Sequence, residues 1–368
     1  MLTVNAGVLR SARTIEFMKF KVAERLEPGF VKVSTKHLSI CGSDVDYWKY
    51  NGDVPSDFLL IHEAGGVVTE VGSDVASVKP GDLVWVNPLW ADPSLPFNER
   101  LHELGLDNLI PLPHHKFLAT PPVQGVLRDT IIYPAHLLHK IEGGASNPER
   151  IPLIEPLACS YNGVDLLNMQ QVQMFGEWTA TVIGPGPIGI MCAAILLNRG
   201  CSKVFLLGRT EGRLKKAKQV LTRHFEAERI ETVVSHSNPQ QVVAAIKSKT
   251  PYERGVDVVM ECSGDEDVVT PAMVYMSPMG QLIEIGRMLH GIKFDRPHGQ
   301  RGQKTFQFSY RFNRRAIEES IQLLFGPDRF DIDDIVTNRF PLQRSAEAFA
   351  LAAQKPPEVI KILIECPN

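Results

Sequence analysis

A glycine-rich turn between an apolar strand and an apolar helix constrains this chain most. The β-branched run Thr179–Ile183 leads into Gly184-Pro185-Gly186-Pro187-Ile188-Gly189, and the apolar residues 190–197 follow. Glycines at this spacing allow a tight turn, a close approach of backbone to a pyrophosphate, and close packing of helix on strand. The helix N-terminus adds N–H groups and a positive dipole end. This segment therefore predicts a dinucleotide site at residues 184–189.

Strand-like and helix-like stretches alternate around this turn. The expected strands are 203–207, 231–234, 256–261 and 281–286, and helical stretches at 211–222 and 239–247 lie between them. Repeated βα units predict a doubly wound parallel sheet with right-handed crossovers. A basic loop from His290 to Lys304 then leads to an expected strand at 305–310 and a helix at 314–324.

The N-terminal part reads mostly as short β segments, and a length of 368 residues favours two domains. Strands are expected at 31–35, 65–72 and 83–86, and residues 87–124 read as a long irregular lobe. The apolar segment 359–364 predicts a last strand that returns to the N-terminal domain.

Charge and cysteine content exclude several classes of partner. Lys and Arg number 39 against 42 Asp and Glu, so no net field attracts nucleic acid or an anionic membrane. The six cysteines are scattered without a C-x-x-C pair, which is typical of a reducing compartment. We expect a soluble, cytoplasmic protein whose partner is a small molecule.

The end of the second strand of the sheet indicates which nicotinamide cofactor would bind. An acidic residue at this position favours NAD, because it bonds the ribose 2′-hydroxyl. This chain has Gly208 there, followed by Arg209, Thr210 and, in the next helical turn, Arg213. Guanidinium groups grip a phosphate in bidentate fashion. The pattern favours NADP over NAD.

Four residues in the first half of the chain are of types that bind catalytic zinc. Cys41, His62, Glu63 and Glu155 each follow an apolar segment. Thiolate, imidazole and carboxylate are the ligands of a zinc ion that keeps one position open. Each residue also has a structural explanation as a buried thiol, a surface pair or a strand end, and the spacing alone is no metal signature.

An ordered set of motifs across the chain resembles the zinc-dependent medium-chain alcohol dehydrogenases, in particular their sorbitol (xylitol) dehydrogenase branch. The motifs, in chain order, are Cys41-Gly42-Ser43-Asp44, His62-Glu63-Ala64-Gly65-Gly66, Lys79-Pro80-Gly81-Asp82, Ala119-Thr120-Pro121-Pro122, Glu155-Pro156-Leu157, the glycine turn, Glu261-Cys262-Ser263-Gly264 and Val336-Thr337-Asn338-Arg339-Phe340-Pro341-Leu342.

The resemblance implies a mostly-β, GroES-like catalytic domain formed by residues 1–157 and 309–368. A Rossmann cofactor domain, residues 158–308, is inserted between these two parts. It implies zinc ligation by Cys41, His62, Glu63 and Glu155, the last directly or through water. The resemblance also implies a proton relay at Ser43 and a homodimer or homotetramer. Tyr47, Phe117 and Tyr310 match substrate-pocket positions, with Tyr47 beside the reacting groups.

Three departures from the family pattern are present. Ile61 replaces the usual glycine before His62, so the ligand turn is expected to be built differently. Residues 98–104 lack the cysteines of a structural zinc, so one zinc is expected. Ser309 stands where sorbitol dehydrogenases carry a polyol-binding arginine, and Arg311 would point elsewhere if the segment is extended.

The resulting hypothesis is reversible oxidation of a secondary alcohol, polyol or sugar-like, to its ketone by hydride transfer with NADP(H). Two alternatives stay open. One is a zinc-free NADPH reductase of the same fold acting on enones or quinones. The other is a non-catalytic dinucleotide-binding protein with a decayed site.

Overall fold

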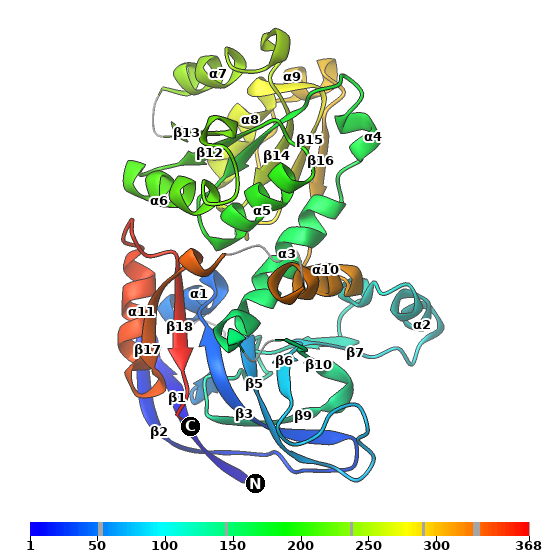
Figure 1. The fold of residues 1–368 in the computed structure, drawn as a ribbon, viewed down its shortest axis with the longest axis vertical. Helices are drawn as coiled ribbons and strands as arrows, with labels where there is room; N and C mark the ends of the chain where they lie inside the picture. The colour runs from blue at the N-terminus through cyan, green and yellow to red at the C-terminus, as the bar shows by residue number, and fades with distance from the viewer. Residues whose placement is uncertain (51–53, 144–145, 236–237, 289–290, 327–331, 368) are drawn as a thin grey trace. The chain divides into compact units, whose positions relative to one another are not determined.

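The chain forms two compact units. A computed structural model describes the chain except residues 51–53, 144–145, 236–237, 289–290, 327–331 and 368 (Figure 1). One unit combines Met1–Glu155 with Asn313–Asn368, and the other comprises Pro156–Phe312. We call them the terminal unit and the central unit.

The central unit is built on one six-stranded parallel sheet, which confirms the doubly wound architecture. Its strands lie in the order β13 (Ile230–Val234), β12 (Lys203–Gly208), β11 (Thr179–Ile183), β14 (Val256–Glu261), β15 (Met276–Glu284), β16 (Thr305–Phe308). The connecting helices can be followed in Figure 1 and are α5 (Pro187–Asn198), α6 (Glu211–Leu221), α7 (Pro239–Lys247), α8 (Val269–Tyr275) and α9 (Arg296–Arg301). A shorter helix, α4 (Met169–Val172), precedes β11.

The apolar sequence around the glycine turn explains the core of this unit. Every residue of β11 is buried, and α5 is buried along residues 189–197 because it packs on β11, β12, β14 and α6. Helices α7 and α8 pack on each other. Because all six strands run parallel, their carboxyl ends lie at one edge, where ligands bind in sheets of this kind.

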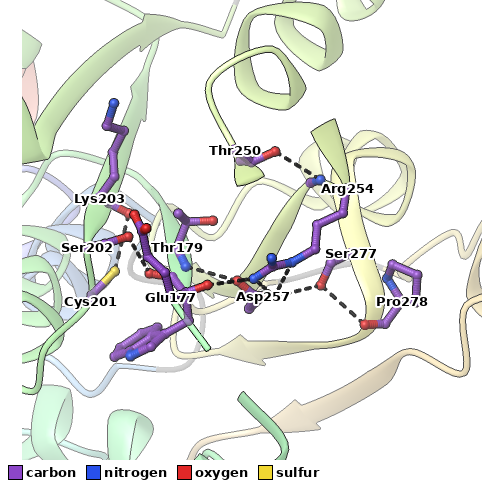
Figure 2. Close-up of polar contacts among 12 residues, drawn as sticks. Glu177, Thr179, Cys201, Ser202, Lys203, Thr250, Arg254, Asp257, Ser277 and Pro278 are labelled. Atoms are coloured by element: carbon purple, nitrogen blue, oxygen red, sulfur yellow. Dashed lines mark hydrogen bonds and ion pairs between the residues drawn. The ribbon is translucent and has the colours of Figure 1, made fainter. Parts of the chain in front are cut away.

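The opposite, amino-terminal edge is tied together by a buried carboxylate (Figure 2). Asp257 accepts hydrogen bonds from the backbone N–H of Thr179 at 2.9 Å and from Ser277 Oγ at 3.1 Å. Arg254 pairs with the same carboxylate at 3.1 Å. One charged side chain thus joins the starts of β11, β14 and β15, which makes this edge structural.

The terminal unit contains three sheets. Its largest sheet orders β10 (Leu138–Lys140), β6 (Leu83–Val86), β5 (Glu63–Val71), β3 (Phe30–Ser39), β18 (Lys361–Glu365), β17 (Val336–Pro341), and β9 (Thr130–Pro134) also pairs with β3. The smaller sheets are formed by β2 (Thr14–Val22), β1 (Leu2–Ser11) and β4 (Phe58–Leu59), and by β7 (Leu89–Ala91) and β8 (His115–Phe117). Its helices are α1 (Gly42–Tyr50), α2 (Pro96–Glu103), α10 (Arg314–Phe325) and α11 (Ser345–Gln354), and α3 (Ile154–Asp165) begins at its end.

The C-terminal strand β18 connects the C-terminal part of the chain to the sheet formed by the N-terminal part. It pairs antiparallel with β3, placing Leu363 opposite Ser39. This pairing sets the last strand directly beside the segment that leads into Cys41.

Two sequence expectations were wrong. Residues 87–124 contain α2, β7 and β8 rather than an irregular lobe, because Pro96 can start a helix whose Leu101 is buried. The loop expected before residue 305 contains α9, whose first turn is capped by Asp295; His290 lies outside the described residues. Among the described helices, none has the length and apolar content needed to cross a bilayer.

Candidate metal and cofactor sites

Three predicted metal ligands converge in the terminal unit. Cys41 lies between β3 and α1, whereas His62 and Glu63 lie at the start of β5. One ligand atom from each lies within 4.8 Å of the others. Tetrahedral zinc ligands lie about 3–4 Å from one another, so small side-chain rotations would bring all three onto one ion. The sulfur, nitrogen and oxygen donors therefore fit a zinc ion.

A buried aspartate fixes the two turns that carry these ligands. Asp44, in the first turn of α1, accepts the backbone N–H of Cys41 at 3.0 Å and that of Ile61 at 2.9 Å. Its carboxylate also lies 3.6 Å from Nδ1 of His62. Burial would lower the pKa of His62, but Asp44 and Cys41 raise it well above its ordinary value. The carboxylate of Asp44 therefore favours the protonated form of the imidazole.

Ile61 adopts a backbone conformation that normally belongs to glycine. Its φ is 71°, which is rare for a β-branched residue and costs about 1–2 kcal/mol. Its N–H donates to Asp44, and its carbonyl accepts the N–H of Val126 at 2.8 Å. Glycine is absent here, but the left-handed turn that glycine favours is present. Whether the turn differs from that of relatives with glycine stays a prediction.

A lysine that the sequence analysis missed is paired with the predicted ligand Glu63. Nζ of Lys361, from β18, lies 2.7 Å from Oε1 and 2.5 Å from Oε2 of Glu63, and Ser39 Oγ also donates to Oε2. Burial would lower the pKa of Lys361, but Glu63, Cys41 and Glu155 raise it. The sequence signal for this pair was a lysine inside the apolar run 359–364. Lysine is rarely buried without a partner, so a lysine in a buried strand predicts a buried acid beside it.

The other residues predicted for this site lie around the cluster at different depths. Glu155, the second residue of α3, is buried and acts electrostatically on Lys361, but it is not one of the three clustered ligands. The ring of Phe117 lies 5.2 Å from that of His62. Ser43 and Tyr47 are partly exposed on α1. Phe117 thus forms an apolar wall beside the imidazole.

The glycine turn in the central unit has the geometry expected of a phosphate-binding turn. Gly184 has a φ of 96°, and a Cβ on Gly189 would lie 2.0 Å from the carbonyl oxygen of Gly184. A Cβ on Gly186 would meet nothing within 4 Å, so the space above it is open. α5 begins at Pro187 with no side chain capping its N-terminus. The turn therefore leaves N–H groups for an anion.

Steric crowding explains why no carboxylate stands at the end of β12. A Cβ on Gly208 would lie 2.7 Å from the ring of Pro185, so a larger residue does not fit there without movement. Arg209 and Thr210 are exposed before α6. Arg213 is half-buried in its first turn, and burial lowers the pKa of its guanidinium.

The segment after β16 corrects the reasoning about Arg311. Ser309 Oγ accepts a hydrogen bond from Asn162 at 3.0 Å, and Tyr310 is exposed. β16 ends at Phe308, and Arg311 has a φ of 53°. The segment is therefore not extended, and strand alternation gives no ground for turning Arg311 away. Its guanidinium stacks 4.8 Å from the centre of the Tyr310 ring.

The terminal unit contains a cluster of three zinc-compatible ligands, and the central unit contains a Rossmann-type parallel sheet. These two features together define a class of dehydrogenase. Residues 27–143 match the family model described as "Alcohol dehydrogenase GroES-like domain", and residues 187–326 match "Zinc-binding dehydrogenase". The chain belongs to the zinc-dependent alcohol dehydrogenase family, so it is an oxidoreductase, as the resemblance predicted.

Similar proteins narrow this class. A protein named L-arabinitol 4-dehydrogenase from Aureobasidium melanogenum is 30% identical, over 94% of this chain and 89% of that protein. A protein named putative D-xylulose reductase from Rhizobium meliloti (strain 1021) is 29% identical, over 98% and 99% respectively. These names place the relatives in the sorbitol/xylitol dehydrogenase branch.

Solved structures share the fold. A 2R,3R-butanediol dehydrogenase from Bacillus subtilis superposes with a TM-score of 0.82 at 24% identity, covering 99% of this chain and 100% of that one. A putative zinc-binding dehydrogenase from Sinorhizobium meliloti 1021, bound to NADP, superposes with a TM-score of 0.81 at 21% identity, with coverage of 99% and 100%. At these identities the similarity speaks for the fold alone.

Proposed function

We propose that this protein interconverts a polyol or sugar-like secondary alcohol and its ketone by hydride transfer with NADP(H). The observation that carries the proposal is the convergence of Cys41, His62 and Glu63. The names of the relatives, D-xylulose reductase and L-arabinitol 4-dehydrogenase, support the polyol class.

In this proposal the terminal unit holds the metal and the central unit holds the cofactor. Cys41, His62 and Glu63 would bind zinc, with Glu155 as the fourth candidate ligand and the second carboxylate. The chemistry that zinc supplies in such a site is Lewis acidity, which eases deprotonation of an alcohol near neutral pH. Ser43, partly exposed on α1, would pass the proton towards solvent.

Four residues are proposed as substrate contacts. Tyr47, Phe117, Ser309 and Tyr310, which match substrate-pocket positions of the family, would contact the substrate. We add Arg311, because its left-handed backbone removes the objection to it and its guanidinium can donate to several hydroxyls.

Preference for NADP rests on the steric exclusion of a carboxylate at Gly208 and on the arginines that follow. The NADP bound in the Sinorhizobium meliloti structure supports a dinucleotide cofactor in a fold of this kind. Replacing Arg209 and Arg213 with alanine should weaken NADPH binding about 10–100-fold, the range of one charge-assisted hydrogen bond, and leave NADH binding nearly unchanged. An equal loss for both cofactors would contradict the preference.

A homodimer or homotetramer is also proposed. β16 is the last strand of its sheet, with Phe308 64% exposed on it. An exposed apolar edge strand favours pairing with a second copy. Light scattering should give an oligomer for the wild type and a smaller species for Phe308→Glu. A monomeric wild type would contradict the proposal.

Metal analysis combined with a substrate screen tests the central proposal. The purified protein should contain about one zinc per chain and oxidise polyols with NADP. Cys41→Ala should lose zinc and turnover while retaining NADPH binding. A protein that binds NADPH but no zinc would instead support a zinc-free reductase if it reduces enones or quinones, and a non-catalytic protein if it does not.

A further inference from the structure

Two cysteines of the central unit lie within reach of each other and have no part in the proposed hydride transfer. The sulfurs of Cys192 and Cys262 are 3.9 Å apart, and both thiols are free. Cys192 is fully buried in α5, whereas Cys262 is partly exposed directly after β14. The pair therefore joins the helix behind the glycine turn to the neighbouring strand end.

Cys262 is held tightly against the glycine turn. Its N–H donates to the carbonyl of Ile183 at 2.9 Å, the last residue before that turn. A Cβ on Gly184 would lie 3.0 Å from the carbonyl carbon of Cys262 and 2.9 Å from the N–H nitrogen of Ser263. The gap between the two segments is therefore too narrow for even a methyl group. A shift of the Cys262 backbone would act on the turn through its hydrogen bond to Ile183 and through the narrow gap at Gly184.

We propose that Cys192 and Cys262 form a reversible disulfide on oxidation by a peroxide, and that this disulfide weakens dinucleotide binding. The second half rests on the proposed function. Sulfurs in a disulfide are about 2.05 Å apart, so the bond draws these two together by about 2 Å. That movement is large compared with the narrow gap between the Cys262 segment and Gly184.

The chemistry balances with hydrogen peroxide as the oxidant. Peroxide oxidises the partly exposed Cys262 thiol to a sulfenic acid and is itself reduced to water. The Cys192 sulfur then attacks the sulfenic sulfur, the S–S bond forms, and a second water leaves. A dithiol such as dithiothreitol reverses the reaction.

The local environment makes this oxidation slow. The hydrogen bond with Cys192 and burial both raise the pKa of the Cys262 thiol well above its ordinary value. Since the thiolate is the reactive form, oxidation should take sustained peroxide rather than a brief pulse. Diamide, a direct thiol oxidant, provides an independent route to the same bond.

The test uses the full-length protein and reads binding rather than turnover, because peroxide also attacks Cys41. Reduced and oxidised samples are alkylated, digested and searched for a peptide linked between residues 192 and 262. NADPH affinity is measured by fluorescence titration on the same samples. Cys192→Ala and Cys262→Ala remove the bond. Cys201→Ser is the matched control, because its hydroxyl keeps the hydrogen bond that Cys201 donates to the Lys203 carbonyl.

We expect the linked peptide and at least tenfold weaker NADPH binding in the oxidised wild type and in Cys201→Ser, with recovery in dithiothreitol. Both alanine variants should keep their affinity after oxidation. The inference is overturned if neither peroxide nor diamide produces the linked peptide. It is also overturned if the linked protein binds NADPH with unchanged affinity. A reduced wild type that binds neither NADPH nor NADH overturns the proposed function and the cofactor half of the inference, while the linked peptide still decides whether the bond forms.

Discussion

Replacing Lys361 with methionine should destabilise the metal-free protein strongly, and more at pH 7 than at pH 5.5. The side chains of Lys361 and Glu63 are 3% and 0% exposed, so the variant leaves a carboxylate buried without its cation. Breaking such a pair costs about 3–5 kcal/mol. Glu63 can escape part of this cost by taking up a proton.

The cost of protonating the Glu63 carboxyl is the upper limit on the stability that the variant loses, and this limit depends on pH. Protonating a carboxyl of ordinary pKa near 4.3 costs about 3.7 kcal/mol at pH 7 and about 1.6 kcal/mol at pH 5.5. The variant should therefore lose about 3–4 kcal/mol at pH 7 and under about 2 kcal/mol at pH 5.5. In the wild type the pKa of Lys361 is raised, so the ion pair stays charged at every pH below the ordinary lysine pKa. The pair's contribution to stability is lost only as the pH rises through the raised pKa of Lys361.

Equilibrium urea unfolding with a chelator present measures this loss. Tryptophan fluorescence reports mainly on the terminal unit, which contains Trp48, Trp85 and Trp90. Lys32→Met is the matched control: Lys32 also lies 2.5 Å from a carboxylate, that of Glu70, but these side chains are 29% and 54% exposed. That control should lose less than about 1 kcal/mol.

Two results would refute this reasoning. A loss below about 1 kcal/mol at pH 7 would mean that the buried pair contributes no more than a surface pair. A loss that is equal at both pH values would mean that Glu63 does not take up a proton, so packing rather than charge would explain the effect.

Three further predictions follow from the other constraints. Zinc affinity should rise with pH through the neutral range, because the raised pKa of His62 means that metal must displace a proton; a titration that shows no dependence on pH would contradict this. Ile61→Gly should be more stable than Ile61→Ala by about 1 kcal/mol in urea unfolding, because only glycine tolerates a φ of 71° without strain; the usual order, with alanine more stable, would count against it. Asp257→Ala should destabilise the protein by about 3–5 kcal/mol, since Arg254 and two further donors lose their acceptor; unfolding followed by circular dichroism would show this, and a loss under 1 kcal/mol would be inconsistent with it.

Periodicity predicted much of the central unit because β11, β14 and α5 are largely buried, mostly apolar runs. β14 and α7 begin and end at the residues expected from the sequence, and the turn at Gly184 has the backbone conformation that its glycine permits. Residues 87–124 were harder to predict. Their short elements depend on Pro96 and on pairing across the lobe, which leave little periodic signal.

The candidate site was predictable in its ligand types and not in its supports. Cys41, His62 and Glu63 stand beside apolar segments in the sequence, and their donor types together with the family resemblance predicted a metal site. Nothing local connects Lys361 to Glu63, which is 298 residues away. That contact exists because β18 pairs with β3, and strand pairing over such a separation cannot be derived from periodicity.

Ile61 shows why a departure from a family pattern does not by itself indicate a decayed site. Steric strain would drive a β-branched residue out of the left-handed region at a gain of about 1–2 kcal/mol. Leaving it would break the bond from Ile61 to the buried carboxylate of Asp44, a charge-assisted hydrogen bond contributing about 1.5–3 kcal/mol. It would also expose a side chain that is fully buried, at about 1.5–3 kcal/mol. The balance favours the strained turn, so the position of His62 is set by Asp44 and by packing rather than by the residue that precedes it.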